Sequence, residues 1–297
     1  MSIHRLISPF LTIVLTAALC IPTASAQTSF KLKKEKGHYY LTTTVNGNPD
    51  IKVLVGTGAR VNIGETDFEK MMKDEPYDTI PYDKKNLRAE TDEYNIKKVV
   101  EGTITFGDLS YTGRIFVLED FDKITMPVHL LKNEADSTAN LICFNFKENT
   151  LGFIKRDAVD TDKMYSFNIV KYSPIPTFET TMELSDTYGN DCDISGNMQF
   201  NIASGTPVFL FRKNVARQLK NAGIRVFPSY DKSSGEVVGE GIFAQYCKIG
   251  ELTMKGASIG ITNKMWFKDA FGCVGPALFG KNDVIIDPVH NKIFYSK

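Results

Sequence analysis

The stretch IKVLVGTGARVNI, Ile51 to Ile63, decides the fold. An apolar run leads into a Gly-Thr-Gly sequence at residues 56–58, and a second apolar run follows it. β-Branched residues are frequent in both runs, which favours strands, and glycine allows a tight turn between them. The stretch therefore predicts two strands that meet at a sharp turn.

The same unit occurs a second time in the chain. The segment MQFNIASGTPVFLF (198–211) places Ala203 opposite Gly56 without a gap. Two later blocks match in the same order: ITFGDLSYTG with CKIGELTMKG, and LICFNFKENTLGFIK with DVIIDPVHNKIFYSK. Three ordered matches indicate an internal duplication. Each copy is predicted to be mostly strand, with one short helix after its turn.

The N-terminal segment indicates export. Residues 1–26 carry Arg5 and no acid, then an apolar run, and end in Ala-Ser-Ala. This order is typical of a secretory signal peptide cleaved after Ala26; an uncleaved anchor and a lipoprotein signal at Cys20 are the alternatives. We expect a periplasmic or extracellular protein with no membrane contact beyond the signal peptide.

The duplication also predicts the domain organisation. We expect an N-terminal lobe over residues 27–156, an inter-lobe linker over 157–178 and a C-terminal lobe over 179–297, and a monomer because both lobes lie in one chain. The chain has 35 Lys and Arg, one of them in the leader, against 35 Asp and Glu. This balance indicates no nucleic-acid or anionic membrane partner. The sequence contains no metal-ligand spacing, and we expect no cofactor.

Cysteine and histidine use leaves several possibilities open. Four cysteines follow the leader: Cys143, Cys192, Cys247 and Cys273. In an exported protein they allow two disulfides in any of three pairings, and Cys143 fits a buried free thiol equally well. The histidines after the leader, His38, His129 and His290, fall in no Ser-His or Cys-His motif. They fit ordinary turn or surface positions.

The duplicated arrangement resembles the aspartic protease superfamily of pepsin and the retroviral proteases. Each half of such a protein supplies a strand, an Asp-Thr-Gly or Asp-Ser-Gly turn and a returning strand. The closing segment GPALFGKNDVIIDPVHNKIFYSK (275–297) resembles the corresponding element of the retropepsin-like bacterial branch. The resemblance implies an all-β, bilobal pepsin-like fold, with two retropepsin-like β-barrel lobes and a short helix in each.

The resemblance also shows what this sequence lacks. It implies two carboxylates, one from each lobe, that share a proton and activate a water. Gly56 and Ala203 occupy these two positions, so no catalytic residue of this kind is intact. Loss of the central groups of a hydrolase costs on the order of 10⁴ to 10⁶ in rate, and we expect no aspartic-protease turnover.

The neighbours of the missing acids retain the family pattern. By the resemblance, the hydroxyls of Thr57 and Ser204 would support the turns. Gly58 and Gly205 would permit close approach of the backbone. Other acids fit structural roles better: Asp287 a turn at a strand end, and Glu65 and Asp67 the first turn of a helix.

Two functions from different classes follow. The first is a pseudo-protease that retains an inter-lobe cleft and binds an extended peptide or protein segment through strand-like hydrogen bonds. The second is an aspartic endopeptidase of the retropepsin-like type in an inactivated form. The state of the inter-lobe cleft distinguishes the two functions. Peptide binding requires an open groove covered by flap-like hairpins near residues 95–106 and 234–245. A groove filled by side chains such as Arg60 or Phe209 would leave no room for a peptide.

Overall fold

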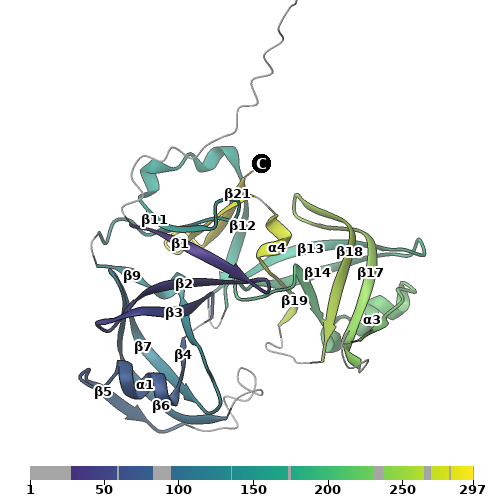
Figure 1. Ribbon diagram of the computed structural model, residues 1–297. Helices are drawn as coiled ribbons and strands as arrows, with labels where there is room; N and C mark the ends of the chain where they lie inside the picture. The colour runs from purple at the N-terminus through teal and green to yellow at the C-terminus, as the bar shows by residue number, and fades with distance from the viewer. Residues whose placement is uncertain are drawn as a thin grey trace, which may run out of the picture.

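The computed structural model describes residues 28–58, 60–82, 95–134, 136–172, 175–230, 237–263, 269–280 and 282–296. The expected signal peptide lies outside these residues. The described chain forms two β-rich lobes joined by a central sheet (Figure 1). This arrangement confirms the predicted all-β, bilobal fold class.

The N-terminal lobe is built on one sheet of mixed parallel and antiparallel strands. Its strands are β2 (His38–Val45), β3 (Asn48–Gly56), β4 (Val61–Gly64), β5 (Tyr77–Ile80), β6 (Ile96–Phe106), β7 (Leu109–Leu118), β8 (Ile124–Pro127) and β9 (Lys132–Asn133). Helix α1 (Glu65–Met71) follows β4, and the 3₁₀ helix η1 (Val128–Leu130) follows β8. The hairpin β6–β7 turns at Gly107, whose φ of 62° suits glycine.

The C-terminal lobe repeats this order. Its strands are β13 (Thr177–Asp186), β14 (Asp191–Phe200), β15 (Val208–Phe211), β16 (Phe227–Tyr230), β17 (Val237–Ile249), β18 (Leu252–Thr262) and β19 (Ala270–Val274). Helix α3 (Arg212–Asn221) follows β15, and α4 (Pro276–Phe279) follows β19. Each lobe thus has the short helix predicted after its turn. None of the helices in the described ranges is long and apolar enough to cross a membrane.

Strand pairing is duplicated as well as strand order. In the first lobe β3 lies parallel to β8, and β4 lies parallel to β7 and antiparallel to β8. In the second lobe β14 lies parallel to β19, and β15 lies parallel to β18 and antiparallel to β19. The same crossings therefore place both turns at corresponding points of the two lobes.

A central sheet joins the lobes. Its strands run in the order β1 (Thr28–Glu35), β11 (Thr150–Ile154), β10 (Leu141–Asn145), β20 (Asp283–Asp287), β21 (Lys292–Ser296) and β12 (Met164–Lys171). β10 and β20 pair across the middle. The stretch expected to be a linker contains two 3₁₀ helices, η2 (Arg156–Ala158, which begins just before it) and η3 (Thr161–Lys163), as well as β12. In the second half, β12 takes the place that β1 has in the first.

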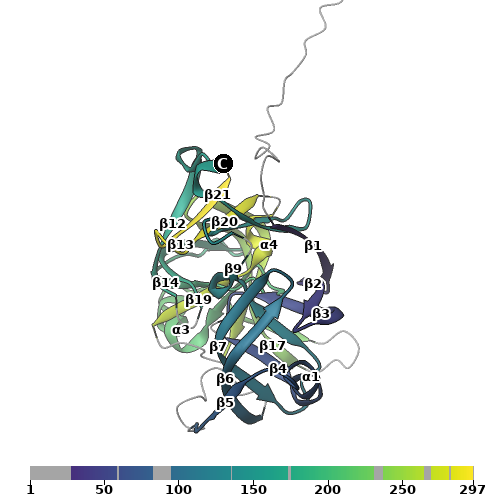
Figure 2. The same cartoon turned by 90° about the vertical axis from the view of Figure 1, so that its left-hand side faces the viewer.

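Apolar burial holds the two lobes and the central sheet together. One continuous core cluster contains residues of both lobes and of the central sheet. Among its fully buried large side chains are Phe106, Phe144, Phe178 and Phe200, each of which stabilises the fold by roughly 1.5–3 kcal/mol relative to an exposed side chain. Figure 2 shows β6 and β7 on the outer side of the first lobe, with the second lobe behind them.

The cysteines form no disulfide. Cys143, Cys192, Cys247 and Cys273 are all free, and the last three are buried. The two-disulfide possibility that the sequence left open is therefore not realised, because these side chains fill separate apolar positions in strands. Burial raises the pKa of the Cys143 and Cys247 thiols to about 12, which makes them poor nucleophiles.

Candidate functional site at the lobe interface

The first turn is fastened to the opposite lobe. β3 ends at Gly56, which pairs with Pro127 of β8. The side chain of the next residue, Thr57, is 0% exposed. Its hydroxyl donates a hydrogen bond to the carbonyl of Phe200 at 2.6 Å and accepts one from the amide of Ile202 at 3.2 Å. One buried hydroxyl thus joins the first turn to the end of β14 and the residues after it.

The second turn is built differently. β14 ends at Phe200, three residues before the position that aligns with Gly56. The side-chain oxygen of Asn201 accepts a hydrogen bond from the amide of Ala203 at 3.0 Å. The main-chain carbonyl of Asn201 accepts one from the amide of Ser204, also at 3.0 Å. The hydroxyl of Ser204 donates to the carbonyl of Thr206 within the same turn, at 3.0 Å. Thr57 and Ser204 are therefore not equivalent: Thr57 bonds across the interface and Ser204 bonds locally.

The two positions that lack an acid face one another. A Cβ placed on Gly56 would lie 3.4 Å from the Cβ of Ala203, which is ordinary contact distance. Gly56 is buried and Ala203 is half-buried. Neither side chain can hold a proton or orient a water. The structure thus brings together the two residues that the sequence paired, without the chemistry that the resemblance implies there.

The glycines of the two turns differ in what surrounds them. No described atom outside its chain neighbours lies within 4 Å of a Cβ placed on Gly58, so no close approach is visible there among the described residues. A Cβ on Gly205 would lie 3.5 Å from His38, an ordinary contact. Gly275, by contrast, must be glycine, because a Cβ there would come within 2.4 Å of the carbonyl oxygen of Thr206. Gly275 thus lets the chain before α4 pack directly against the second turn.

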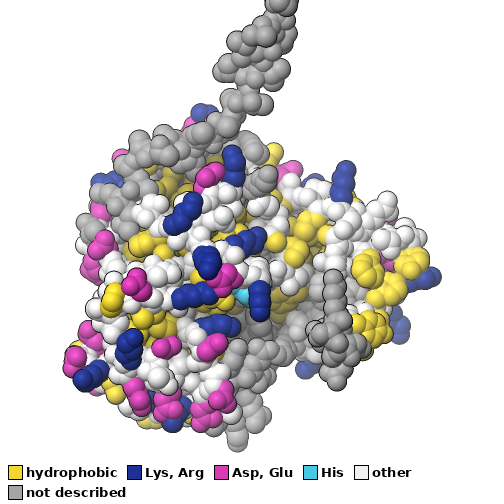
Figure 3. All heavy atoms as spheres, in the orientation of Figure 1, with side chains coloured by type: hydrophobic (Ala, Val, Ile, Leu, Met, Phe, Trp, Pro, Cys, Tyr) yellow, Lys and Arg dark blue, Asp and Glu magenta, His cyan; other side chains and the backbone are white. Residues whose placement is uncertain are grey.

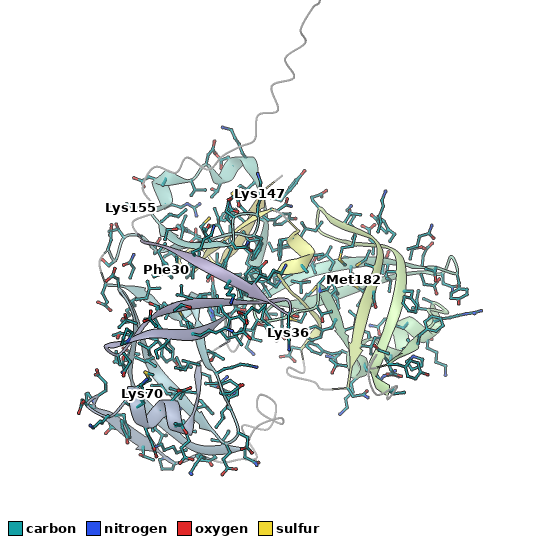
Figure 4. The ribbon with its side chains drawn as sticks, viewed as in Figure 1. Phe30, Lys36, Lys70, Lys147, Lys155 and Met182 are labelled. Carbon is teal, nitrogen blue, oxygen red and sulfur yellow. The ribbon has the colours of Figure 1, made fainter. Side chains whose placement is uncertain are left out.

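The tip of the β1–β2 hairpin also contacts the second turn. Gly37 has a φ of +85°, and a Cβ there would lie 3.1 Å from the backbone of Gly205. The Nδ1 atom of His38 lies 2.7 Å from the carbonyl oxygen of Ala203. Because a carbonyl only accepts, Nδ1 carries the proton in this bond. Figure 4 labels Lys36 at this tip, where the hairpin reaches the second lobe.

Sequence reasoning missed this contact. Lys-Gly-His between two alternating segments signals a turn, but nothing local places that turn against residue 203. His38 was interpreted as an ordinary turn residue. In the structure His38 is the first residue of β2, directly after the turn at residues 36–37, and its ring joins the two lobes.

Arg60 and Phe209, which could have filled a groove, make contacts inside their own lobes. The guanidinium carbon of Arg60 lies 3.8 Å from the centre of the Phe116 ring in β7. The rings of Phe209 and Phe211 meet edge to face at 5.7 Å. Of the segments expected to form flap-like hairpins, residues 95–106 lie almost entirely in β6 and residues 237–245 lie in β17, whereas residues 234–236 lie outside the described residues.

The other acids serve structural roles. Asp287 is 0% exposed and accepts hydrogen bonds from Arg156 and from the amides of Val289 and His290, at 3.1 and 3.0 Å for the amides. Glu65 lies in the first turn of α1 and forms an ion pair with Lys97. Among the residues that the structure describes, no group of three or more His, Cys, Asp or Glu side chains is arranged to hold a metal ion.

Two lobes of this topology, with matched turns at their interface, define the pepsin-like fold of the aspartic proteinases. Among solved structures, the chain is similar to an aspartic proteinase from Irpex lacteus. The TM-score is 0.55 at 12% identity, over 91% of this chain and 97% of that one. This likeness shows the fold. A scan of protein-family models found no match, and a search of curated proteins found none either.

Proposed function

We propose that the protein is a catalytically inactive, pepsin-like pseudo-protease whose inter-lobe cleft binds extended peptide. The observation that supports it is the contact between the positions of Gly56 and Ala203, at the point where the resemblance requires two carboxylates. A shared proton between two carboxylates is the basis of this reaction. Neither residue can supply it.

Retention of the supporting turn favours binding over loss of all function. The hydroxyl of Thr57 is fully buried and satisfied by two backbone groups of the other lobe. Peptides bind in such folds as added strands, through main-chain hydrogen bonds. We further propose that the protein acts as a monomer outside the cytoplasm, which the leader pattern and the two lobes in one chain support.

The test combines cleavage with mapped binding. Purified chain from Gln27 to Lys297 is incubated with an unfolded polypeptide from acid to neutral pH, and hydrogen exchange is measured with and without that polypeptide. We expect no cleavage, and protection at residues 56–58 and 200–206. Cleavage by the natural sequence would overturn the pseudo-protease proposal. Absence of protection around the two turns would overturn the peptide-binding part.

The alternative function is an aspartic endopeptidase in an inactivated form. The contact between positions 56 and 203 favours it, because two carboxylates introduced there would lie close enough to share a proton. The double variant Gly56→Asp, Ala203→Asp tests it, with each single variant as a matched control. Cleavage by the double variant alone would support an intact protease cleft. A folded double variant that cleaves nothing would count against this alternative.

A further inference from the structure

The far end of the C-terminal lobe carries a group of apolar side chains, four of them exposed and one, Phe227, half-buried. We name them the distal patch: Tyr188, Phe227, Tyr230, Val237 and Phe243. Tyr188 and Phe243 are each 54% exposed, Tyr230 is 58% exposed and Val237 is 60% exposed. The ring centre of Phe227 lies 6.1 Å from that of Tyr188 and 5.4 Å from that of Phe243. Exposed apolar side chains that gather in this way mark an interaction surface more often than single ones do.

Three separate chain segments build the distal patch. They are the β13–β14 turn, the strand β16 and the strand β17. The turn is fixed to the loop after α3, because the side chain of Asn190 donates a hydrogen bond to the carbonyl of Gly223 at 3.1 Å. In Figure 1 the β13–β14 turn projects from the second lobe, away from the first. Figure 3 shows hydrophobic side chains gathered over this end of the molecule, with Lys and Arg side chains beside them.

Positive charge borders the distal patch. The segment 212–230, which contains α3 and β16, has five Lys and Arg and no acid. Lys213, Arg217 and Lys220 are exposed, and no ion pair involves them within the described part of the chain. The guanidinium carbon of Arg225 lies 4.1 Å from the ring centre of Tyr188. Arg225 therefore adjoins the distal patch, and the three exposed bases of α3 precede it in the chain.

Of the acids near the distal patch, Asp191 is exposed and accepts a hydrogen bond from Ser185, whereas two others are buried or paired. Asp186 is 1% exposed and accepts hydrogen bonds from the amides of Tyr188 and Asn190, at 2.8 and 2.9 Å. Glu240 is paired with Arg212. The balanced charge of the whole chain, which indicated no anionic membrane partner, averages over a basic segment at residues 212–230.

We propose that the distal patch and the basic face of α3 together bind the surface of an anionic lipid bilayer. Aromatic side chains are favourable at the level of the lipid headgroups, and Lys and Arg are attracted to anionic lipids. A second copy of the chain fits less well, because a symmetric contact would bring two basic helices together. The proposal is independent of the inter-lobe site and of its proposed function.

Vesicle co-sedimentation tests the proposal. The chain from Gln27 to Lys297 is used, because the apolar leader would itself bind lipid. We expect binding to vesicles of phosphatidylcholine with roughly one quarter phosphatidylglycerol, and much weaker binding to pure phosphatidylcholine. Binding should fall when salt is raised from about 0.1 M to about 1 M, since the screening length drops from about 10 Å to about 3 Å.

Two pairs of variants locate the surface. The charge variant is Lys213→Gln, Arg217→Gln, with Lys132→Gln, Lys171→Gln as the control for exposed lysines elsewhere. Each lost charge should weaken binding roughly fivefold. The apolar variant is Tyr188→Ser, Phe243→Ser, with Val170→Ser, Val289→Ser as the control; these valines are 54% and 60% exposed on the central sheet and in its β20–β21 turn.

The results of these measurements either support or overturn the lipid-binding proposal. Weakened binding in both distal variants, and unchanged binding in both controls, supports the proposal when circular dichroism shows that all four variants are folded. Equal binding to the two vesicle types would overturn the lipid-binding proposal. The distal patch would then be a candidate surface for a protein partner. Equal weakening in the controls would also overturn the lipid-binding proposal, because the attraction would then not be specific to this surface.

Discussion

Replacement of Thr57 by valine is expected to weaken the junction between the lobes. Valine keeps the shape of threonine and removes the hydroxyl. The carbonyl of Phe200 and the amide of Ile202 then lose their partner in a site that is fully buried. Each buried polar group left unsatisfied costs about 1–3 kcal/mol, so we expect a loss of about 2–6 kcal/mol. A typical total free energy of unfolding is about 5–15 kcal/mol.

Two control variants isolate this effect. Thr57→Ser keeps the hydroxyl and removes a methyl group, at about 1 kcal/mol. Ser204→Ala, the counterpart in the other turn, removes a hydroxyl that bonds only within its own turn, at about 1 kcal/mol.

Thermal unfolding followed by circular dichroism measures all three. At about 2 °C per kcal/mol for a chain of this length, Thr57→Val should melt roughly 4–12 °C lower and each control roughly 2 °C lower. Equal shifts for Thr57→Val and Ser204→Ala would refute the reasoning, because the two turns would then be energetically alike.

Three more predictions follow from the structure. Gly275→Ala should destabilise the protein by about 1–3 kcal/mol or more, whereas Gly58→Ala, with open space around its Cβ position, should shift the melting temperature little. Burial lowers the pKa of His129 from 6.5 to about 3, so the neutral ring is favoured in the fold and the free energy of unfolding should fall as pH drops below about 6.5, by up to about 1.4 kcal/mol per pH unit. His129→Phe should flatten that slope in urea titrations, and an unchanged slope in this variant would contradict the prediction. Finally, the chain from Gln27 should show four free thiols when it is unfolded without reductant, because its four cysteines are unpaired, and a count of two or zero would contradict that pairing state.

Much of the fold was readable from the sequence because its signals are local or repeated. Alternating apolar residues bury one face of a strand, as residues 100–106 of β6 show. The helical spacing after each turn produced α1 and α3. The strand β12 was not predicted, because it lies within residues 157–178, which were expected to form the inter-lobe linker. It forms a strand by pairing with β21, which is far away in the sequence.

The sequence by itself determined the chemistry that is missing. The side chains of Gly56 and Ala203, a hydrogen atom and a methyl group, have no proton to exchange in any fold, so these two residues cannot share one as two carboxylates would. The identity of the side chain was sufficient for that inference. The repeat also aligned these two residues without a gap, and the structure places them next to each other.

Only the tertiary structure decided how the two turns are supported. Thr57 bonds to a carbonyl 143 residues away, and His38 to one 165 residues away. The aligned residue Ser204 forms no such cross-lobe bond, because β14 ends three residues early and Asn201 organises the turn instead. Such contacts depend on which distant segments meet when the lobes pack. Local sequence patterns do not specify which distant segments pack together. The distal patch could not be predicted from them for the same reason, because it is built from three separate segments.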